Sequence, residues 1–452
     1  MEALCVGRKT PNLHFMSLLL LVNFLTTILL GVVSIWAGVK VARSCSRPDM
    51  IAPVVFVVLV VFACPVFLDW LLGIPYYEHS ILGAMNEARF DDGIAIIYNL
   101  YVSFFIAIFT RKIGDNRVRV NPIEFNQFVL TLSRFSVVLY IGVFIPFLLL
   151  PFTTSVEDVL TFGVERVSRY GQEGMDWKES LLAKMSIVSV VCATFLWCLN
   201  SRKKDRLKNT ILLIVILFDC LFQGKRSLFF LACVFYLGLN YFSGISLTNL
   251  VKRSIAIGCI FTLFFVGYGK NIGSTFHETY VGLRADFGRD DVTKYTMKKV
   301  LVDDGKIVDY PGHSFVFWGT FWIPRAYWAD KPWPYAVYFT NSLLPEHVRL
   351  RRISRGEEFL GWGMTTSIVE EVVANFKWGG LLFPIGALWG IFAIQRLAFI
   401  PRCVAFSIFV LLLGIHFIAI YPFYILLGTC ILIWGLREKI PLSLLMRVKN
   451  EK

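Results

Sequence analysis

Charged residues are scarce in this chain, and their scarcity excludes most kinds of soluble protein. Asp, Glu, Lys and Arg make up 17% of the 452 residues, while 56% are hydrophobic and the mean hydropathy is +0.63. Soluble domains carry about 25% charged residues, so this chain has too few to cover several globular surfaces. Its apolar residues also fall in long blocks, which is typical of segments solvated by lipid. The composition therefore excludes a soluble cytosolic enzyme and a disordered chain, and it predicts a polytopic membrane protein.

The common signatures of nucleotide, metal and serine chemistry are also missing. The sequence contains no GxxxxGK[ST], HExxH, GxSxG or CxxC pattern. Its ten cysteines lie mostly inside apolar runs and show no metal-ligand spacing, so we interpret them as small packing residues. The adjacent acids Asp290–Asp291 and Asp303–Asp304 offer oxygen ligands, but adjacent acids on a loop seldom hold a divalent ion. We expect no metal site and no cofactor.

Apolar runs of the length that crosses a bilayer recur along the whole chain. Together they predict an all-α fold of about 11 transmembrane helices. The runs lie near 13–38, 51–73, 93–110, 128–152, 180–199, 210–223, 227–245, 254–270, 379–395, 403–420 and 422–436.

The distribution of Lys and Arg predicts the orientation of these helices. Cytoplasmic loops of membrane proteins collect basic residues, and most basic residues of the short loops fall in alternate loops such as 111–127 and 200–209. This rule accounts for the formal net charge of +13 without a nucleic-acid partner. It predicts three parts: helices 1–8 over residues 1–270, a large extracytoplasmic loop over 271–378, and helices 9–11 with a cytoplasmic tail over 379–452.

Two cations stand at a tight outer turn between two apolar runs. Lys225 and Arg226 have almost no loop around them, so we expect them at the membrane surface. Gly224 permits the turn, and Ser227 can cap the next helix, whose N-terminal amides favour an anion. The pair is a candidate phosphate site, and the alternative is an interfacial anchor that reaches for the headgroups.

A stretch rich in aromatic residues and proline lies inside the large loop, at 322–335. Its Tyr327, Trp328 and Trp333 offer flat faces for stacking on sugar rings, although Trp and Tyr also prefer the headgroup zone. Arg325 and Lys331 add cations, the first as a bidentate fork for phosphate and the second as a point charge. An interfacial re-entrant segment is the alternative interpretation.

Further cations, including Arg351 and Arg352, lead toward a late apolar run. From Arg325 to Arg355 the chain holds six basic and two acidic residues. Such segregation is what a site for a polyanionic headgroup requires, and a solvated charged face is the alternative.

Three residues of the same loop are candidate proton acceptors. Glu370 and Glu371 precede the late apolar run, and His313 lies nearer the middle of the loop. The sequence does not rank the three.

This layout resembles the O-antigen polymerase family, the oligosaccharide repeat-unit polymerases of the bacterial inner membrane. The resemblance rests on the Gly-Lys-Arg-Ser turn at 224–227, the Ile-Pro-Arg…Lys-Pro stretch at 323–332, and the approach from Gly361-Trp362-Gly363 through Glu370 to 376–380. It covers roughly residues 220–395, and the N-terminal half is similar only in being apolar and multi-spanning.

The resemblance implies a glycosyltransferase of the lipid-donor membrane class. Such an enzyme joins repeat units carried on undecaprenyl pyrophosphate into the polysaccharide of lipopolysaccharide, at the periplasmic face of the inner membrane. Fixed cations would stabilise the departing pyrophosphate. The implied partners are the lipid-linked oligosaccharide, membrane lipid and a chain-length regulator protein. The candidate pyrophosphate-binding residues are Lys225, Arg226, Arg325, Lys331, Arg351 and Arg352.

Two other functions stay open at this stage, and so does a membrane scaffold without catalytic activity. An O-antigen ligase has similar spans, a similar loop and the same kind of donor, and a catalytic histidine in the large loop is typical of it. The histidines of this chain are scattered. A transporter or flippase for the lipid-linked glycan would place ionisable residues at mid-membrane between repeated halves, whereas the polar residues here gather outside the spans.

Overall fold

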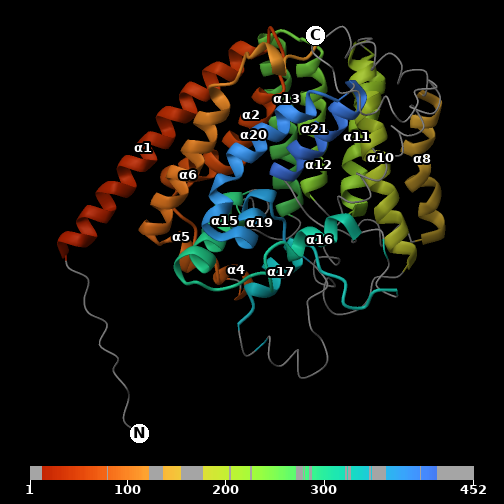
Figure 1. The fold of residues 1–452 in the computed structure, drawn as a ribbon. Helices are drawn as coiled ribbons and strands as arrows, with labels where there is room; N and C mark the ends of the chain where they lie inside the picture. Colours follow the sequence, from red (N-terminus) through yellow and green to blue (C-terminus); the bar gives the residue numbers. More distant parts are fainter. Residues whose placement is uncertain are drawn as a thin grey trace.

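The chain is mostly helical in the computed structural model (Figure 1). The described part contains no β-strand, and its one isolated β-bridge joins Asp49 to Arg119. The structure describes residues 13–78, 80–121, 136–153, 177–202, 205–223, 226–270, 278, 280–282, 284, 288–320, 323, 327–345, 348, 363–397 and 399–414.

Four helical stretches of this described part are long and apolar enough to cross a membrane. The first, Ser17–Ser44, belongs to α1 (Leu13–Ser44), and only 11% of its most apolar window is buried, so its side chains face outward. The third is α6 (Asp92–Thr110). The second combines α2 (Ile51–Val58), the π-helical η1 (Leu59–Ala63) and α3 (Cys64–Leu72), and the fourth combines α19 (Ile368–Phe376), η4 (Lys377–Leu382) and α20 (Phe383–Ile394).

Other helices overlap the remaining predicted spans that fall on described residues. Every predicted span up to 403–420 overlaps a helix, and the last one, 422–436, lies outside the described residues. The helical membrane architecture is therefore confirmed, while the number of eleven spans and the side of the large loop stay predictions. These helices are α8 (Ser136–Thr153), α10 (Trp177–Arg202), α11 (Arg206–Gln223), α12 (Arg226–Phe242), α13 (Leu247–Lys270) and α21 (Phe399–Gly414).

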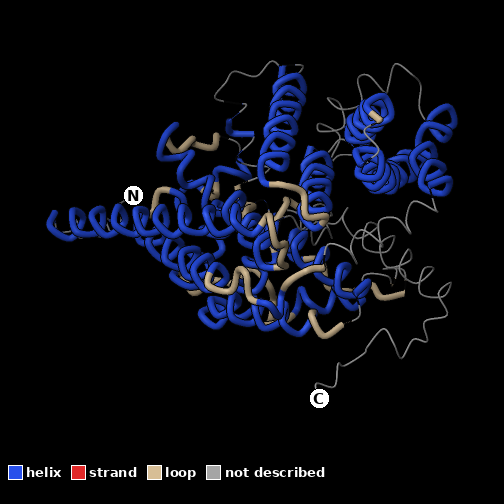
Figure 2. The backbone as a smooth tube through the Cα atoms, turned by 90° about the horizontal axis from the view of Figure 1, so that it is seen from above, coloured by secondary structure: helices blue, strands red, loops and turns tan. Residues whose placement is uncertain are grey.

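Two groups of helices each build an apolar core. Buried side chains of α1, α2, α6, α20 and α21 form one core, and those of α8, α10, α11, α12 and α13 form the other. Figure 2 shows helices of the second group gathered at one side of the molecule. The two groups meet at α12, whose Tyr241 belongs to the first core while its Tyr236 stacks on Trp197 of α10 at 4.0 Å between ring centroids.

A proline shapes the second long stretch. Pro65 has no amide hydrogen, so the helical ladder widens into η1 just before it, where the Cys64 amide donates to the Leu59 carbonyl. The Tyr98 hydroxyl of α6 donates to the Phe62 carbonyl at 2.8 Å. The irregular turn is thereby fixed against α6.

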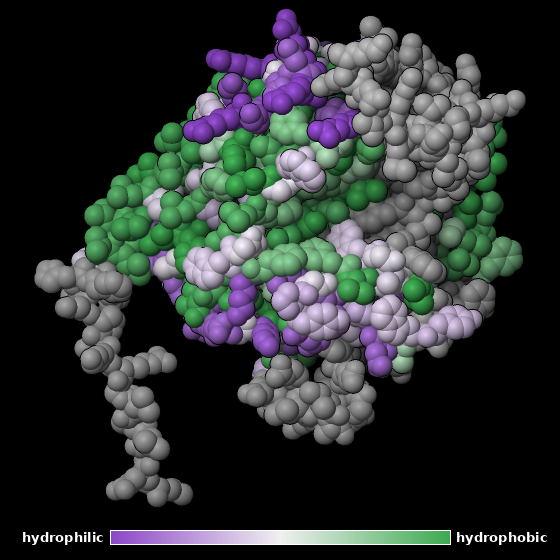
Figure 3. All heavy atoms as spheres, in the orientation of Figure 1, coloured by the Kyte–Doolittle hydropathy of each residue, from purple (hydrophilic) through white to green (hydrophobic). Residues whose placement is uncertain are grey.

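Short helices cover one end of the molecule. They lie where α3 ends and α6 begins, which we call the α16 end (Figure 1). Figure 3 shows hydrophilic residues at this end and at the opposite end, with a hydrophobic band between them. The short elements are α4 (Ser80–Gly83), α5 (Asn86–Arg89), α15 (Arg289–Met297), η3 (Lys298–Val302), α16 (His313–Thr320) and α17 (Tyr335–Ser342), while η2 (Asn116–Val118) follows α6 at the opposite end.

The segment predicted as a large loop is thus partly helical. The apolar stretch expected at 379–395 begins earlier, at Ile368, because Ser367 and Glu370 form a capping box at the start of α19. The last residues of the predicted loop therefore belong to a candidate membrane span.

Candidate functional site

The helix α15 is short and rich in charge, yet nearly all of it is buried. Eight of its nine residues are buried, and Tyr295 is partly exposed. It packs against α3, η1, α5, α6 and α19 at the α16 end. Each buried charge needs a partner in such a place, because the loss of hydration is otherwise uncompensated.

Arg284 supplies the largest share of this pairing. Its Nε and Nη2 atoms lie 3.0 and 2.7 Å from the two carboxylate oxygens of Asp69 in α3. Its Nη1 and Nη2 atoms lie 2.6 and 2.8 Å from those of Asp290 in α15. Nη2 also lies 3.0 Å from Asp291 Oδ1. A single guanidinium thus ties a membrane-spanning helix to α15 with two bidentate pairs.

Two more cations complete the charge balance. Arg89 Nε lies 2.8 Å from Asp291 Oδ1, and Lys294 Nζ lies 3.2 Å from Asp290 Oδ2. Three cations therefore face three carboxylates, all with side chains at most 7% exposed. We call Asp69, Arg89, Arg284, Asp290, Asp291 and Lys294 the Arg284 network.

Two tyrosine hydroxyls supplement the network. Tyr77 donates to Asp291 Oδ2 at 2.6 Å, and Tyr280 donates to Asp69 Oδ1 at 2.7 Å. They satisfy carboxylate oxygens that the cations leave partly open.

The electrostatics of Asp290 follow from this geometry. Burial alone would raise the pKa of its carboxyl, but the Arg284 guanidinium and the Lys294 ammonium outweigh burial and hold that pKa well below its ordinary value of 3.8. Asp290 is therefore a carboxylate at neutral pH and neutralises the cations beside it.

The three aspartates lie close enough together to share a cation. One oxygen from each of Asp69, Asp290 and Asp291 lies within 4.8 Å of the others. The Arg284 guanidinium binds all three carboxylates. We therefore assign this acidic cluster a structural role, in which an arginine side chain supplies the positive charge.

The helix α19 presents its two glutamates to different neighbours. Glu370 is fully buried; its Oε1 accepts the Ser367 amide at 2.8 Å, and the Ser367 hydroxyl contacts its Oε2. Thr293 of α15 lies 3.5 Å from the same Oε2. Both oxygens of Glu370 therefore serve the capping box and the packing of α19 on α15.

Glu371 and Asn375 connect α19 to α16 instead. The indole Nε1 of Trp318 donates to Glu371 Oε1 at 3.2 Å. Asn375 donates to the Ser314 hydroxyl at 2.9 Å and accepts the Gly312 amide at 2.8 Å. These bonds fix the first turn of α16, where His313 stands.

His313 has polar and aromatic neighbours. Its Nδ1 lies 3.2 Å from Asp309 Oδ2, and the Tyr338 hydroxyl lies 3.2 Å from Nδ1 and 3.4 Å from Nε2. The Tyr310 ring stacks on the imidazole at 4.1 Å between centroids. The Asp309 side chain is 66% exposed and that of His313 is 11% exposed, so the pair stands at the edge of the protein surface.

Lys331 contacts α16 itself, and the backbone of Trp333 contacts Tyr338 of α17. Lys331 is buried, with Nζ 2.8 Å from the Ile323 carbonyl and 4.9 Å from the ring centroid of Phe317, one turn after His313. The Trp333 amide donates to the Tyr338 hydroxyl at 3.3 Å. A histidine, a cation and aromatic rings thus meet in one place. We call His313, Phe317, Lys331, Trp333 and Tyr338 the α16 site.

The other candidate residues lie elsewhere or outside the described chain. Tyr327 is 86% exposed at the surface, and Trp328 is partly buried. Arg226 begins α12, but its side chain is not described, and the remaining cations of the predicted pyrophosphate site lie outside the described residues; their roles stay predictions. The latter are Lys225, Arg325, Arg351 and Arg352.

The sequence interpretation missed several residues that contact the candidate residues or belong to the Arg284 network. Asp309 precedes His313 by four residues, but it lies in the turn before α16, so no helical periodicity marks it in the sequence. Asp69 stands alone inside an apolar run, and an acid in such a run is itself a marker of function or of a buried pair. Arg284 and Tyr338 have no comparable signal, because their partners lie far away in the sequence.

We found no match to this chain among protein-family models, curated proteins or solved structures.

Proposed function

We propose that this protein is a membrane glycosyltransferase of the O-antigen polymerase type. It joins oligosaccharide units carried on undecaprenyl pyrophosphate into a polysaccharide at the periplasmic face of a bacterial inner membrane. The observation that carries the proposal is the α16 site, where His313, paired with Asp309, lies one helical turn before Phe317, whose ring contacts the buried cation of Lys331.

The charge at the opposite end of the molecule supports the proposed orientation. The last turn of α1, the loop that follows it and the segment after α6 carry several cations, of which Arg43, Arg47 and Arg117 are exposed. Basic residues close to the ends of membrane helices favour the cytoplasm. The α16 end then faces the periplasm, where the lipid-linked oligosaccharide is exposed.

In this reaction His313 is the proton acceptor. The acceptor hydroxyl attacks the anomeric carbon of the donor, the new glycosidic C–O bond forms, and the bond to the pyrophosphate breaks. His313 takes the hydroxyl proton, with Asp309 orienting the imidazole. We prefer His313 to Glu370 because the capping box occupies both Glu370 oxygens, and to Glu371 because that carboxylate is fully buried.

The leaving group is an anion, so the site needs fixed positive charge. Lys331 supplies one ammonium on the Phe317 face, and we propose that Arg325, next to the same stretch, supplies a second cation. Cations held in a partly dry cleft stabilise developing negative charge more than water does. The Tyr310 ring stacks on His313 and is 53% exposed, so it offers a surface for the sugars. We propose that the Trp333 ring offers a second one.

An O-antigen ligase is the second candidate function, and His313 is the observation that favours it. A ligase uses the same donor and the same leaving group but transfers the glycan to a lipid acceptor. The α16 site has the base and the cation that both reactions need. Lipopolysaccharide from a deletion strain separates them: single capped repeats indicate a lost polymerase, and unattached long polymer indicates a lost ligase.

Reconstitution of the reaction tests the proposal directly. The purified protein in nanodiscs is given lipid-linked repeat units, and the products are separated by size. We expect a ladder of polymer from the wild type and a rate lower by roughly 10²–10⁴-fold from His313→Gln.

The control is Asp304→Asn, which changes an exposed acid of the same segment that pairs with Lys377 and not with a residue of the α16 site. If His313→Gln formed polymer at the wild-type rate, His313 would not be the proton acceptor. If the protein moved the lipid-linked units across the membrane without forming a glycosidic bond, its function would be transport and not glycosyl transfer.

A further inference from the structure

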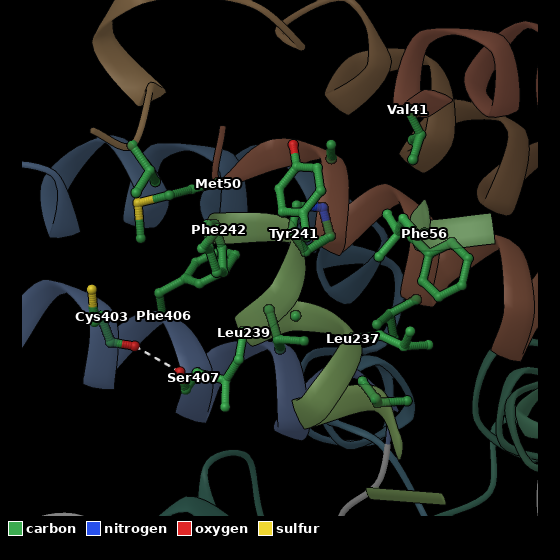
Figure 4. A pocket seen from close by; sticks show the side chains of 18 of the residues that line it. Val41, Met50, Phe56, Leu237, Leu239, Tyr241, Phe242, Cys403, Phe406 and Ser407 are labelled. Atoms are coloured by element: carbon green, nitrogen blue, oxygen red, sulfur yellow. Dashed lines mark hydrogen bonds between the residues drawn. The ribbon is translucent and has the colours of Figure 1, made fainter. Parts of the chain in front are cut away.

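An apolar cavity lies between the two groups of helices, toward the end opposite the α16 site. Its volume is about 190 Å³, and α1, α2, α10, α12, α13 and α21 all contribute to its walls. Figure 4 shows its lining, in which Phe242 of α12 and Phe406 of α21 meet edge to face at 5.8 Å between ring centroids. The cavity is far from His313, so it is a separate site.

Water has few partners in this cavity. The Tyr241 hydroxyl is already bonded to the Ser44 hydroxyl and to the Asp49 amide, each at 3.0 Å. The Ser407 hydroxyl donates to the Cys403 carbonyl at 2.7 Å. A buried water needs two to four polar partners, and an apolar cavity of about 150 Å³ stays dry and takes up hydrocarbon. The lining therefore favours an apolar occupant.

The bilayer supplies such an occupant next to the opening. Phe56 lines the cavity and is 41% exposed on the outside of α2, within a candidate membrane span, so the wall reaches the lipid-facing surface. A void forfeits dispersion contacts on every lining atom. An acyl chain that moves in from the bilayer restores these contacts and leaves no apolar surface in water.

Cations lie beside the cavity at the same end of the bundle. Arg402 lines it and uses Nε and Nη2 to bind the Leu397 carbonyl, which leaves further N–H donors of its guanidinium. Arg253 precedes the lining residue Ser254, but its guanidinium binds Asn240 and the Tyr236 hydroxyl, so Arg402 supplies the charge at the cavity. The nearby acid, Asp49, is buried and accepts the amides of Ile51 and Ala52. The rim is therefore positive above an apolar interior.

We propose that this cavity binds part of one acyl chain of an anionic phospholipid, whose phosphate is held by Arg402. Basic pockets between membrane helices are known to hold anionic headgroups, and this one adds an apolar space for a segment of the chain. The site lies where the two helix groups meet, so a bound lipid packs against both. This inference is independent of the proposed glycosyltransferase activity.

Gly238 allows the site to be blocked with little disturbance. It lines the cavity, and a Cβ atom built on it meets nothing within 4 Å, so a larger side chain enters the empty space without a clash. The protein is reconstituted in nanodiscs with equal parts of phosphatidylglycerol and phosphatidylcholine, extracted into mild detergent, and its retained phospholipid is quantified by mass spectrometry. We expect the wild type to retain phosphatidylglycerol, and Gly238→Leu to retain roughly tenfold less.

Two further variants complete the experiment. Gly386→Leu is the matched control, since Gly386 also has open space beside it but lies on α20 outside the cavity; it should retain lipid like the wild type. Arg402→Gln should lower the retention of phosphatidylglycerol roughly fivefold and remove its advantage over phosphatidylcholine. Equal retention by the wild type and Gly238→Leu, or no retention by the wild type, would overturn the proposal.

If Gly238→Leu does not fold, a photolabelling measurement on the wild-type protein tests the same proposal. Phosphatidylglycerol with a photoreactive group on one acyl chain is added to wild-type nanodiscs, and the labelled peptides are identified. Labels on peptides of α12 and α21 that line the cavity support the site. Labels confined to the outward face of α1 contradict it.

Discussion

Arg284 Nη2 lies 2.7 Å from Asp69 Oδ2, although 215 residues separate the two in the sequence. Asp69 is near the end of α3, and Arg284 also holds Asp290 at the start of α15. This contact brings the charged helix α15 into the body of the membrane protein. It also sets the position of α19, which packs on α15 and in turn fixes the first turn of α16.

Removal of Asp69 should therefore destabilise the whole α16 end. Asp69→Asn keeps the size of the side chain but leaves three buried cations with two carboxylates. Breaking a buried ion pair costs about 3–5 kcal/mol, because the remaining charge is uncompensated. Unfolding of the purified protein in detergent, followed by tryptophan fluorescence, measures the loss.

The matched control is Asp115→Asn. Asp115 pairs with Arg117 at 2.9 Å, but the Arg117 side chain is 69% exposed, and exposed pairs contribute little. We expect no measurable change in the free energy of unfolding. If both variants were equally stable, the Arg284 network would have no structural role.

The pH dependence of stability should reveal Asp290. The folded-state pKa of its carboxyl lies below the ordinary value of 3.8, which represents the unfolded chain, so the unfolded state binds the proton more tightly. The stability that Asp290 contributes is thus fully present above about pH 5 and is lost as the pH falls through and below that ordinary value. Thermal unfolding in detergent between neutral and acid pH follows this loss.

Asp290→Asn has no carboxyl group at this position, so it lacks the pH-dependent stability that Asp290 contributes at neutral pH. That variant should be less stable at neutral pH, and its stability should fall less steeply on acidification than that of the wild type. Parallel curves for the two proteins would show that Asp290 titrates alike in the folded and unfolded chains.

Two adjacent glycines after α19 should respond very differently to the same substitution. A Cβ atom on Gly380 would stand 2.6 Å from Val373 Cα and 2.7 Å from the Val372 carbonyl oxygen, whereas one on Gly379 meets only Phe376 Cβ at 3.9 Å. Gly380→Ala should therefore lower the free energy of unfolding by about 1–3 kcal/mol through overpacking. Gly379→Ala should leave it nearly unchanged. Equal effects in the same unfolding assay would mean that η4 does not pack closely on α19.

The helices were predictable because apolar runs of bilayer length are a strong signal. The start of α19 was readable too, since Ser367 and Glu370 stand in the Ser-x-x-Glu spacing of a capping box. The burial of α15 was not readable. Arg289–Met297 is rich in charge, which indicates a solvated surface, and only its distant partners Asp69 and Arg89 make burial favourable.

The candidate site was predictable in its residue types but not in its grouping. His313 and Lys331 were identified as candidates, yet their contacts at α16 are with Tyr338 and Phe317, which look like ordinary core residues in the sequence. The three candidate bases also could not be ranked, because hydrogen-bond partners decide which carboxylate is occupied. The structure provides those partners for Glu370 and Glu371.

Lys331 offers a test of how the proposed leaving group is bound. Lys331→Met keeps the apolar stem on the Phe317 ring but removes the ammonium. A hydrogen bond to a charged group is worth about 1.5–3 kcal/mol, so the KM for the lipid-pyrophosphate donor should rise roughly tenfold or more. Lys306→Met, at an exposed position of the same segment, is the control and should behave like the wild type. An unchanged KM in Lys331→Met would exclude this ammonium from the pyrophosphate site.

Asp309 should act through His313 and not through the donor. The Asp309 carboxylate lies 3.2 Å from His313 Nδ1 and is mostly exposed, so Asp309→Asn removes an orienting charge without opening the core. We expect kcat for polymer formation to fall roughly tenfold, at the low end of what general-base catalysis contributes, while KM for the donor stays the same. Asp309→Glu should restore much of the rate, because it returns a carboxylate to the imidazole. A purely structural role would instead lower stability and leave kcat per folded molecule unchanged. The same kcat in Asp309→Asn and in the exposed-site control Asp304→Asn would show that the carboxylate beside His313 takes no part in the reaction.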